Sequence, residues 1–472
     1  MASIQVESVV DALLSDLPSD VVISDPDLLE SYRYDRAMFC PAGVPAALVR
    51  PRETAQVQAA LRVASALGVP VVPQGARSGL SGAANAIDGC LLISTERMNR
   101  VLEVDAGNRL VVTQPGVFNA DLSRAVAEHG LFYPPDPSSW EFCSIGGNLA
   151  TNSGGLCCVK YGVTGDYVLG LEVVLASGEL LRTGRRTVKG VAGYDLTRLF
   201  VGSEGTLGVI TEATLSLRPG AQRPQTMAAL FSSTQAAAEA VTAIIAAGHL
   251  PSLLEIMDQA SVRVSSTFLR SDLPTDCAAM LLAQSDVGGP TGAEEITAIT
   301  ALCAAAGATD LIQADDPAEG ELLMAARRCV LEAFSSLGTT MIDDICVPRT
   351  RLAELMSGVE RIARECDLLI GLPGHAGDGN MHPTVVFDAS DPDQVRRAEL
   401  SFGAVMQLGL DLGGTITGEH GVGMLKREWL AREIGPVALG LHRSLKQAVD
   451  PAGILNPGKV FGGNLRKSAP DD

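Results

Sequence analysis

Long apolar runs are missing from this sequence of 472 residues. No stretch approaches the ~20 consecutive apolar residues that a membrane-spanning helix needs, so we expect no membrane span. Residues 1–7 have neither the basic start nor the apolar centre of a secretory signal peptide. The sequence therefore predicts a cytoplasmic protein.

An excess of basic residues is also missing. The 36 Lys and Arg residues are outnumbered by 55 Asp and Glu residues, which gives a formal net charge of −19, and the charges are scattered rather than grouped. A surface of this sign repels phosphate backbones and anionic lipids. We therefore expect neither nucleic acid nor an anionic membrane as a partner.

Cysteine pairs with zinc-type spacing are absent as well. The ten cysteines are spread over the chain without a C-x-x-C pair, which predicts reduced thiols. Cys157 and Cys158 are adjacent and could form a redox pair. We favour the simpler interpretation, in which they are two small buried residues.

Histidine is scarce and unevenly distributed, since three of the six histidines lie in two glycine-rich stretches. In the first stretch, His375 and His382 flank Asp378-Gly379, a dipeptide that favours a type I′ hairpin turn. Counting outward from that turn, we predict that His375 faces His382 on the neighbouring strand. Their Cβ atoms would then lie roughly 5 Å apart.

The second glycine-rich stretch, residues 418–421, adds the carboxylate of Glu419 and the imidazole of His420. A single stretch of this kind could be a surface turn that happens to carry histidine. Three imidazoles and a carboxylate together indicate a metal site, because imidazole is a common metal ligand.

The length predicts two or three domains. Strands at 46–51 and 69–73 flank a helix at 55–67 with Thr54 as its predicted N-cap, which is a β-α-β start. The following loop, residues 74–82, lacks the G-x-G-x-x-G spacing of dinucleotide-binding proteins. Its small residues would let backbone amides approach an anion such as phosphate.

Residues 144–155 place small and amide-bearing residues between two Gly-Gly pairs. We predict that this backbone lies flat against a planar ligand, with Asn148 and Asn152 as hydrogen-bonding amides. Tight turns over a helix are the alternative interpretation.

Beyond residue 220 helices and strands alternate, in an order that predicts an antiparallel sheet backed by helices on one face. The expected elements include a helix at 318–335 and a strand at 340–346. The predicted organisation is an N-terminal helix and arm (1–45), a cofactor domain (46–219), a cap domain (220–412) and a C-terminal segment (413–472).

Six segments in this order resemble the FAD-linked oxidases of the vanillyl-alcohol oxidase type. They are residues 74–82, 144–155, 202–211, 374–382, 417–423 and 455–459. Within that type, the similarity is to D-lactate dehydrogenases, the glycolate oxidase catalytic subunit and D-2-hydroxyglutarate dehydrogenase. The resemblance implies an α+β fold with a two-part FAD-binding domain, a ferredoxin-like antiparallel cap domain and a helical C-terminal segment.

The resemblance also implies which residues hold FAD, with the pyrophosphate on residues 73–82. They are Pro73, Gln74, Gly75, Ala76, Arg77, Ser78, Gly79, Ser81, Pro135, Asp136, Ser138, Gly146, Gly147, Asn148, Thr151, Asn152, Gly155, Glu204, Gly205, Val209, Ile210 and Asn456. Ala76-Arg77 departs from the small residues that relatives often have in this loop. Because residues 74–82 contain no histidine or cysteine for a covalent link, we expect non-covalent FAD.

In family members with a metal, the ligands match His375, His382 and Glu419. Two imidazoles and a carboxylate suit zinc, manganese and iron, and of these we favour zinc. His420 matches a residue at the substrate, and Arg327 matches the arginine that holds the substrate carboxylate. Arg328 is adjacent, so the choice between the two arginines stays open.

The family resemblance implies oxidation of a 2-hydroxy acid to the 2-oxo acid, with metal-assisted activation and hydride transfer to flavin N5. Ile342, or an apolar neighbour, stands where hydroxyglutarate enzymes carry a lysine, so we favour a small D-monoacid such as D-lactate or glycolate. The alternatives are a D-2-hydroxyglutarate dehydrogenase, a flavin oxidase for a bulkier alcohol or aldehyde, and a non-catalytic flavin- and metal-binding subunit. The electron acceptor is unidentified, and a homodimer is left open.

Overall fold

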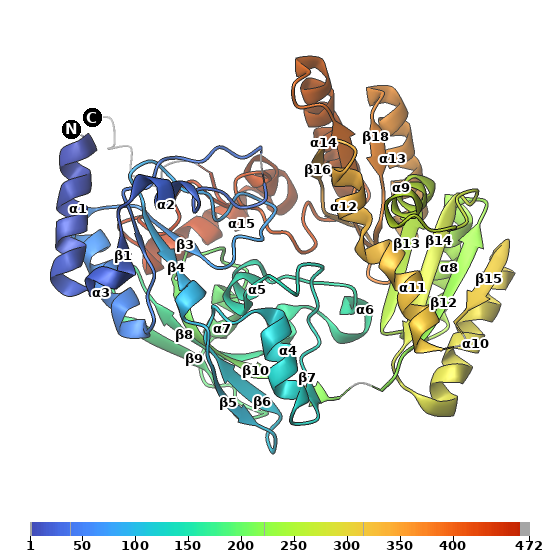
Figure 1. The fold of residues 1–472 in the computed structure, drawn as a ribbon, viewed down its shortest axis with the longest axis horizontal. Helices are drawn as coiled ribbons and strands as arrows, with labels where there is room; N and C mark the ends of the chain where they lie inside the picture. Colours follow the sequence, from blue (N-terminus) through green and yellow to red (C-terminus); the bar gives the residue numbers. More distant parts are fainter. Residues whose placement is uncertain (1, 38, 221, 315, 463–472) are drawn as a thin grey trace. The chain divides into compact units, whose positions relative to one another are not determined.

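The computed structural model describes residues 2–37, 39–220, 222–314 and 316–462. The chain divides into two units, and Figure 1 labels many of their helices and strands. The first unit comprises Met1–Ser153, Val163–Gly220 and Glu419–Asp472, and the second comprises Gly154–Gly162 and Ala221–Gly418.

The first unit contains a four-stranded sheet in the order β1-β2-β4-β3. The strands are β1 (Val22–Ile23), β2 (Ala47–Val49), β4 (Leu91–Ser94) and β3 (Val71–Gln74). The last three are parallel, as a β-α-β start requires, and helix α3 (Thr54–Leu67) joins β2 to β3. The helix ends at Gly68, whose φ of 64° glycine adopts without strain. Its N-cap is Glu53 rather than the predicted Thr54.

A second sheet of the first unit has five antiparallel strands in the order β5-β6-β10-β8-β9. They are β5 (Val101–Asp105), β6 (Leu110–Thr113), β10 (Val209–Ser216), β8 (Val168–Val174) and β9 (Leu180–Gly184). A separate short pair is formed by β7 (Leu131–Phe132) and β11 (Arg218–Pro219).

The remaining helices of the first unit are short, apart from those at its two ends. They are α1 (Ala2–Asp16), η1 (Ser19–Val21), α2 (Pro26–Glu30), η2 (Thr95–Arg97), α4 (Asn119–Ala127), α5 (Ile145–Thr151), η3 (Thr164–Tyr167), α7 (Leu196–Phe200) and α15 (Arg427–Val449). Helix α15 is kinked at Gly435, whose φ is 75° and ψ 169°. After α15, Leu455 pairs in parallel with Val71, so the end of the chain returns to β3.

Helix α5 lies within the stretch that was predicted to lie flat against a planar ligand. The hydroxyl of Ser144 accepts a hydrogen bond from the Gly147 N–H, which is the usual capping interaction of a helix N-terminus. Asn152 then ends the helix in the left-handed conformation, with a φ of 55°. The helix of the alternative interpretation is therefore present, and contact with a planar ligand stays a prediction. Gly146 allows close packing, since a Cβ on Gly146 would lie 2.5 Å from Cβ of Pro115.

The main sheet of the second unit has the order β15-β12-β14-β13-β19-β20-β17, and every neighbouring pair is antiparallel. The strands are β12 (Gln225–Phe231), β13 (Leu253–Asp258), β14 (Ala279–Ser285), β15 (Asp310–Gln313), β17 (Ile345–Cys346), β19 (Gly374–His375) and β20 (Asn380–Met381). Helices α8 (Thr234–Ala246) and α10 (Gly289–Ala305) pack on each other and on β12 and β14 (Figure 1). The predicted antiparallel sheet is confirmed.

A three-stranded sheet completes the second unit, in the order β16-β21-β18. Its strands are β16 (Thr339–Ile342), β21 (Thr384–Phe387) and β18 (Leu369–Gly371). The strand predicted at 340–346 is thus two strands in different sheets, because β16 pairs with β21 and β17 pairs with β20. The change of sheet occurs at Asp343-Asp344.

The other helices of the second unit are α6 (Cys158–Tyr161), α9 (Gln259–Leu269), α11 (Pro317–Arg328), α12 (Val330–Ser335), η4 (Arg349–Arg351), α13 (Leu352–Cys366) and α14 (Pro392–Asp411). The helix predicted at 318–335 is therefore two helices that meet at Cys329. None of the helices in the described part of the chain has the length and apolar character needed to cross a lipid bilayer.

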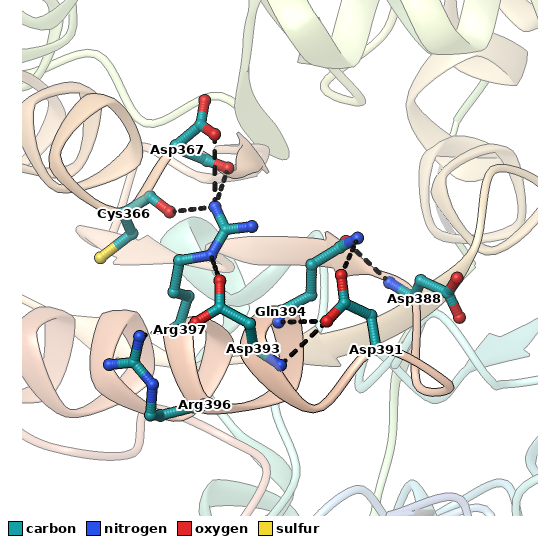
Figure 2. A network of polar contacts seen from close by, with 8 residues as sticks. All are labelled: Cys366, Asp367, Asp388, Asp391, Asp393, Gln394, Arg396 and Arg397. Carbon is teal, nitrogen blue, oxygen red and sulfur yellow. Dashed lines mark hydrogen bonds and ion pairs between the residues drawn. The ribbon is translucent and has the colours of Figure 1, made fainter.

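Helix α14 is fixed to the end of α13 by side chains near its own start (Figure 2). The Asp391 carboxylate caps α14 by accepting from the N–H groups of Asp393 and Gln394. Arg397 donates to the backbone oxygens of Cys366 and Asp367, at 2.8 and 2.7 Å. These carbonyls lie at the C-terminus of α13, where no helical partner remains for them.

The histidine hairpin forms, but its predicted register is wrong. His375 pairs with Asn380, and Gly374 pairs with Met381. The loop is longer than two residues because the N–H of Gly377 bonds to Leu254 of β13, and the N–H of Gly379 bonds back to the carbonyl of His375. The pairing is displaced by two positions, and a displacement by two keeps each side chain on the same face of the sheet.

All ten cysteines lie in the described part of the chain and none of them forms a disulfide; five are buried and five are half-buried. Cys157 and Cys158 belong to the half-buried group, so the interpretation of this doublet as two buried residues is wrong.

Candidate functional site

In the first unit, the glycine-rich loop that follows β3 is tied to the start of helix α5. The Ser144 hydroxyl accepts from the N–H of Ala76 at 3.1 Å as well as from Gly147. Gly75 is required at this contact, because a Cβ there would lie 2.4 Å from the Ser144 hydroxyl oxygen. Two of the segments assigned to the cofactor therefore lie side by side, within one unit.

Two buried amide oxygens beside this loop have no hydrogen-bond partner among the described residues. They are Oε1 of Gln74 and Oδ1 of Asn456, in residues that are 2% and 1% exposed. The amide nitrogen of Gln74 donates to the carbonyls of Tyr32 and Ala84. The amide nitrogen of Asn456 donates to the carbonyls of Ala83 and Glu204. Because buried polar atoms normally have partners, these oxygens fit a polar ligand such as FAD.

Two lysines from the C-terminal part of the chain are also buried in the first unit. Lys459 donates to the carbonyls of Gly82 and Asn85, both at 2.7 Å, and burial lowers the pKa of Lys459 to about 8. Lys446 forms an ion pair with Asp450 and also donates to the backbone of residues 206 and 455. Burial also lowers the pKa of Lys446. Both lysines hold backbone in place and were missed as functional candidates.

Other residues assigned to the cofactor make protein contacts of their own. The Arg77 guanidinium lies 4.1 Å from the ring centre of Tyr32. The Asn152 side chain accepts from the N–H of Gly165, and the Glu204 carboxylate accepts from two backbone N–H groups of residues 422–423.

The remaining residues assigned to the cofactor lie in the first unit, with one exception. Gly155 belongs to the second unit. The first unit contains Pro73, Ala76, Ser78, Gly79, Ser81, Pro135, Asp136, Ser138, Gly147, Asn148, Thr151, Gly205, Val209 and Ile210.

In the second unit, the two histidines of the hairpin lie together. Their ring centres are 4.9 Å apart, with the rings at 82° to each other. They are diagonal neighbours on one face, since His375 pairs with Asn380 and side chains two positions apart point the same way. Both are nearly buried, at 2% and 6% exposed.

Glu255 on β13 joins this histidine pair to Arg327. Its carboxylate lies 2.8 and 2.9 Å from Nδ1 of His375 and 2.7 Å from Nε of Arg327. Glu255 is fully buried, so these contacts are made away from water. A carboxylate on Nδ1 fixes the imidazole with Nε2 directed away from it, which is the usual arrangement of a metal-binding histidine.

The two candidate arginines are clearly distinguished. Arg327 is 4% exposed, and its Nη2 is buried without a hydrogen-bond partner among the described residues. Arg328 is more than half exposed and forms a surface ion pair with Glu321. Burial and a free guanidinium nitrogen therefore favour Arg327 as the group that meets a ligand.

Two adjacent buried acids were not predicted as site residues, and one of them lies near His382. Asp344 lies 3.7 Å from Nδ1 of His382 and accepts a hydrogen bond from the Thr417 hydroxyl. Asp343 accepts from the N–H of Asp344, and both residues are at most 1% exposed. They directly follow Ile342, the predicted apolar wall.

Glu419 and His420 begin the last stretch of the first unit, directly after Gly418, where the second unit ends. Within the first unit, the segment that follows them is held by Glu204 through residues 422–423. Within the second unit, Gly418 lies against Asn380 of the hairpin, because a Cβ on Gly418 would be 2.4 Å from Oδ1 of Asn380.

Glu255 is the most informative residue that sequence reasoning missed. It is the one charged residue in the otherwise apolar stretch Leu253–Met257, and a charge within a buried strand needs a partner. The sequence alone could therefore have indicated Glu255 as a site residue. Asp343 and Asp344 gave no comparable signal, because their position became special only when the strand changed sheets.

Two family models match the chain. Residues 45–184 match "FAD binding domain", and residues 221–460 match "FAD linked oxidases, C-terminal domain". The glycolate oxidase subunit GlcD of Bacillus subtilis (strain 168) is 43% identical over 425 residues, which are 90% of this chain and 90% of the relative. D-lactate dehydrogenase of Anaerostipes hadrus is 34% identical, over 94% of this chain and 95% of its own.

Solved structures with low sequence identity share the fold. p-Cresol methylhydroxylase with substrate bound superposes with a TM-score of 0.82 at 18% identity, over 98% of both chains. 4-Ethylphenol oxidase from Gulosibacter chungangensis gives a TM-score of 0.80 at 19% identity, also over 98% of both chains. The predicted vanillyl-alcohol oxidase type of fold is confirmed.

Proposed function

Because the chain belongs to the family of FAD-linked oxidases, we propose that this FAD-dependent oxidoreductase oxidises a small D-2-hydroxy acid, such as D-lactate or glycolate, to the 2-oxo acid. Relatives with matching length are named glycolate oxidase subunit and D-lactate dehydrogenase, which supports this substrate class.

The observation that carries the proposal is the buried row of Arg327, Glu255 and His375. The Glu255 carboxylate forms an ion pair with Nε of Arg327. Nη2 of Arg327 has no hydrogen-bond partner in the described part of the chain. A buried guanidinium nitrogen of this kind suits a substrate carboxylate, since guanidinium and carboxylate form strong charge-assisted hydrogen bonds. Arg327 would bind the substrate and orient its C2–H.

The donor set fits a divalent ion. We propose that His375, His382 and Glu419 hold zinc, or manganese or iron, and that the ion when bound supplies Lewis acidity to the substrate hydroxyl. Glu255 supports this assignment by orienting His375. Glu419 is one residue beyond Gly418, which lies at the hairpin, and consecutive Cα atoms are about 3.8 Å apart.

We assign proton removal to His420. Its neighbour Glu419 would face the ion, and adjacent residues of an extended backbone point in opposite directions. Oxidation of the alcohol removes the O2 proton and a hydride from C2. His420 would take the proton, and the bound flavin supplies the hydride acceptor at N5.

The preference for a monoacid rests on residues 342–344. Ile342 offers no cation to a second carboxylate, and the buried Asp343 and Asp344 that follow it would repel one.

The free cysteines support a reducing, cytoplasmic compartment, and the lack of histidine and cysteine in residues 74–82 supports non-covalent FAD. Electrons would pass from the flavin to an acceptor that is not identified.

Anaerobic flavin reduction tests the proposal. Purified yellow protein is mixed separately with D-lactate, L-lactate, glycolate and D-2-hydroxyglutarate, with and without prior chelator treatment. We expect fast loss of the oxidised flavin absorbance with a D-monoacid or glycolate, and loss of that reaction after chelation. Reduction by the diacid alone would move the assignment to D-2-hydroxyglutarate. A flavin that none of these acids reduces would refute the substrate class.

A further inference from the structure

Glu204 connects three separate segments of the first unit. Its backbone N–H donates to the carbonyl of Ala150 in helix α5, and its own carbonyl accepts from the Asn456 side chain at 2.7 Å. Its carboxylate accepts from the N–H groups of Val422 and Gly423, both at 2.8 Å. One residue thus joins α5, the returning C-terminus and the segment that begins with Glu419-His420.

The backbone of Glu204 is held in an unusual conformation to make these contacts. Its φ is 50°, in the left-handed region that residues other than glycine rarely adopt. The residue is only 6% exposed, so burial raises the pKa of the carboxyl to about 7, against the effect of the two N–H donors. Backbone strain of this kind persists only where the surrounding contacts hold the residue in place.

The segment that Glu204 holds has little freedom to move. A Cβ on Gly421 would lie 3.0 Å from the Glu204 carboxylate, and a Cβ on Gly423 would lie 2.1 Å from the carbonyl oxygen of Ser81. The N–H of Met424 also bonds to Ser81. Residues 421–424 are therefore fixed between Glu204 and the glycine-rich loop.

We propose that Glu204 is a positioning residue for Glu419 and His420: its carboxylate fixes the backbone at residues 422–423 and so sets the place from which both side chains project. The proposal rests on the function proposed above, because it gives Glu419 and His420 their roles. Glu204 itself touches neither substrate nor metal in this account.

Hydrogen exchange tests the positioning without relying on turnover. In Glu204→Gln the amide NH2 group faces an N–H donor, so at least one of the two backbone hydrogen bonds is lost. We expect amide exchange in a peptide covering residues 418–426 to accelerate at least tenfold when samples of equal FAD content are compared.

Turnover then tests the consequence. A displacement of about 1 Å at reacting groups costs on the order of 100-fold in rate, so kcat should fall by about that factor while KM stays within about threefold. Glu204→Asp, whose carboxylate is one methylene shorter, should lie between Gln and the wild type in both measurements.

Glu172→Gln is the matched control. Glu172 is also a buried carboxylate of the first unit, but it contacts Thr54, Thr211 and Arg182. Both exchange at 418–426 and kcat should be unchanged in this variant. If Glu172→Gln lowers kcat as much as Glu204→Gln, the effect is general destabilisation and the proposal is overturned.

Two outcomes separate this proposal from the function on which it rests. Unchanged exchange in Glu204→Gln, or faster exchange with unchanged kcat, would overturn the positioning role while wild-type flavin reduction still supports the function. If no 2-hydroxy acid reduces the wild-type flavin, the proposed function fails. Accelerated exchange would still support the effect of Glu204 on the segment.

Discussion

Arg327 and Arg328 are neighbours in the sequence with opposite surroundings. Arg327 is buried against Glu255, whereas Arg328 is exposed and pairs with Glu321. Burial beside a single carboxylate leaves part of the Arg327 guanidinium available, and a planar guanidinium can serve Glu255 and a substrate carboxylate together.

Arg327→Lys should therefore lower kcat/KM by about 100- to 1,000-fold, because one ammonium cannot make both sets of contacts. Arg328→Lys, a control at an exposed ion pair, should stay within about twofold of the wild type. Steady-state kinetics with the best hydroxy acid measures both. Equal losses in the two variants would show that the assignment of Arg327 is wrong.

Glu255 gives a prediction about metal retention. Glu255→Gln removes the charge that orients His375, and loss of such a supporting carboxylate typically costs 10- to 100-fold in metal affinity. Metal content after dialysis against a weak chelator should fall, with FAD content unchanged. Glu321→Gln at the surface is the control, and retention of full metal content in Glu255→Gln would contradict the proposed ligand set.

Lys459 predicts a dependence of stability on pH. Burial lowers the pKa of Lys459 from 10.5 to about 8, so between these values the unfolded chain binds more protons than the folded protein. The contribution of Lys459 to the free energy of unfolding should therefore rise as the pH goes from about 8 to 10.5. The rise is roughly 1.4 kcal/mol for each pKa unit of difference between the two states. Below pH 8 both states are protonated and the cost of burying the ammonium is fully present.

The measurement compares the wild type with Lys459→Met by chemical unfolding at several pH values. The stability difference should grow in favour of the wild type from pH 8 to 10.5, since Met has no proton to lose. Lys189→Met, at an exposed lysine, should show no such trend. A difference that does not change with pH would contradict the lowered pKa.

At the level of elements, Arg396 and Arg397 on helix α14 form a natural pair for comparison. Both form ion pairs with Asp393, but Arg397 also donates to the backbone oxygens of Cys366 and Asp367 (Figure 2). Arg397 thus satisfies carbonyls at the end of α13, as a basic side chain at a helix C-terminus does.

Arg397→Ala should lower the free energy of unfolding by about 1–2 kcal/mol, because it leaves two carbonyls without this donor. Arg396→Ala should change it by less than about 0.5 kcal/mol, the usual effect at an exposed ion pair. Urea unfolding followed by circular dichroism measures both. An equal effect of the two variants would show that the contact between α13 and α14 adds no stability.

At the level of the whole molecule, the ten free thiols report on how the chain is buried. Burial raises the pKa of Cys303 to about 12 and of Cys40 and Cys90 to about 11, so these thiols stay protonated at neutral pH. A thiolate is needed for reaction with disulfide reagents.

A thiol titration of the native protein should therefore find no more than the five half-buried cysteines, while all ten should react in denaturant. Iodoacetamide labelling followed by peptide mapping identifies which cysteines react. Rapid labelling of Cys303 in the native protein would contradict its described burial.

The sequence by itself determined most of the elements and indicated which residues to expect in the candidate site. The Asp378-Gly379 pair sets a turn between two histidines, and alternation along a strand puts both on one face even though the register differs by two residues. Local signals of this kind depend only on near neighbours in the chain, which is why they could be read in advance.

Only the tertiary structure decided the partners of those residues. Glu255 meets His375 and Arg327 because β13 pairs with β19, and Asp344 meets His382 because the chain changes sheets after Ile342. Lys459 and Glu204 bind backbone groups far away in the sequence. Such contacts depend on which strands become neighbours, and that follows from the packing of the entire core rather than from any local pattern.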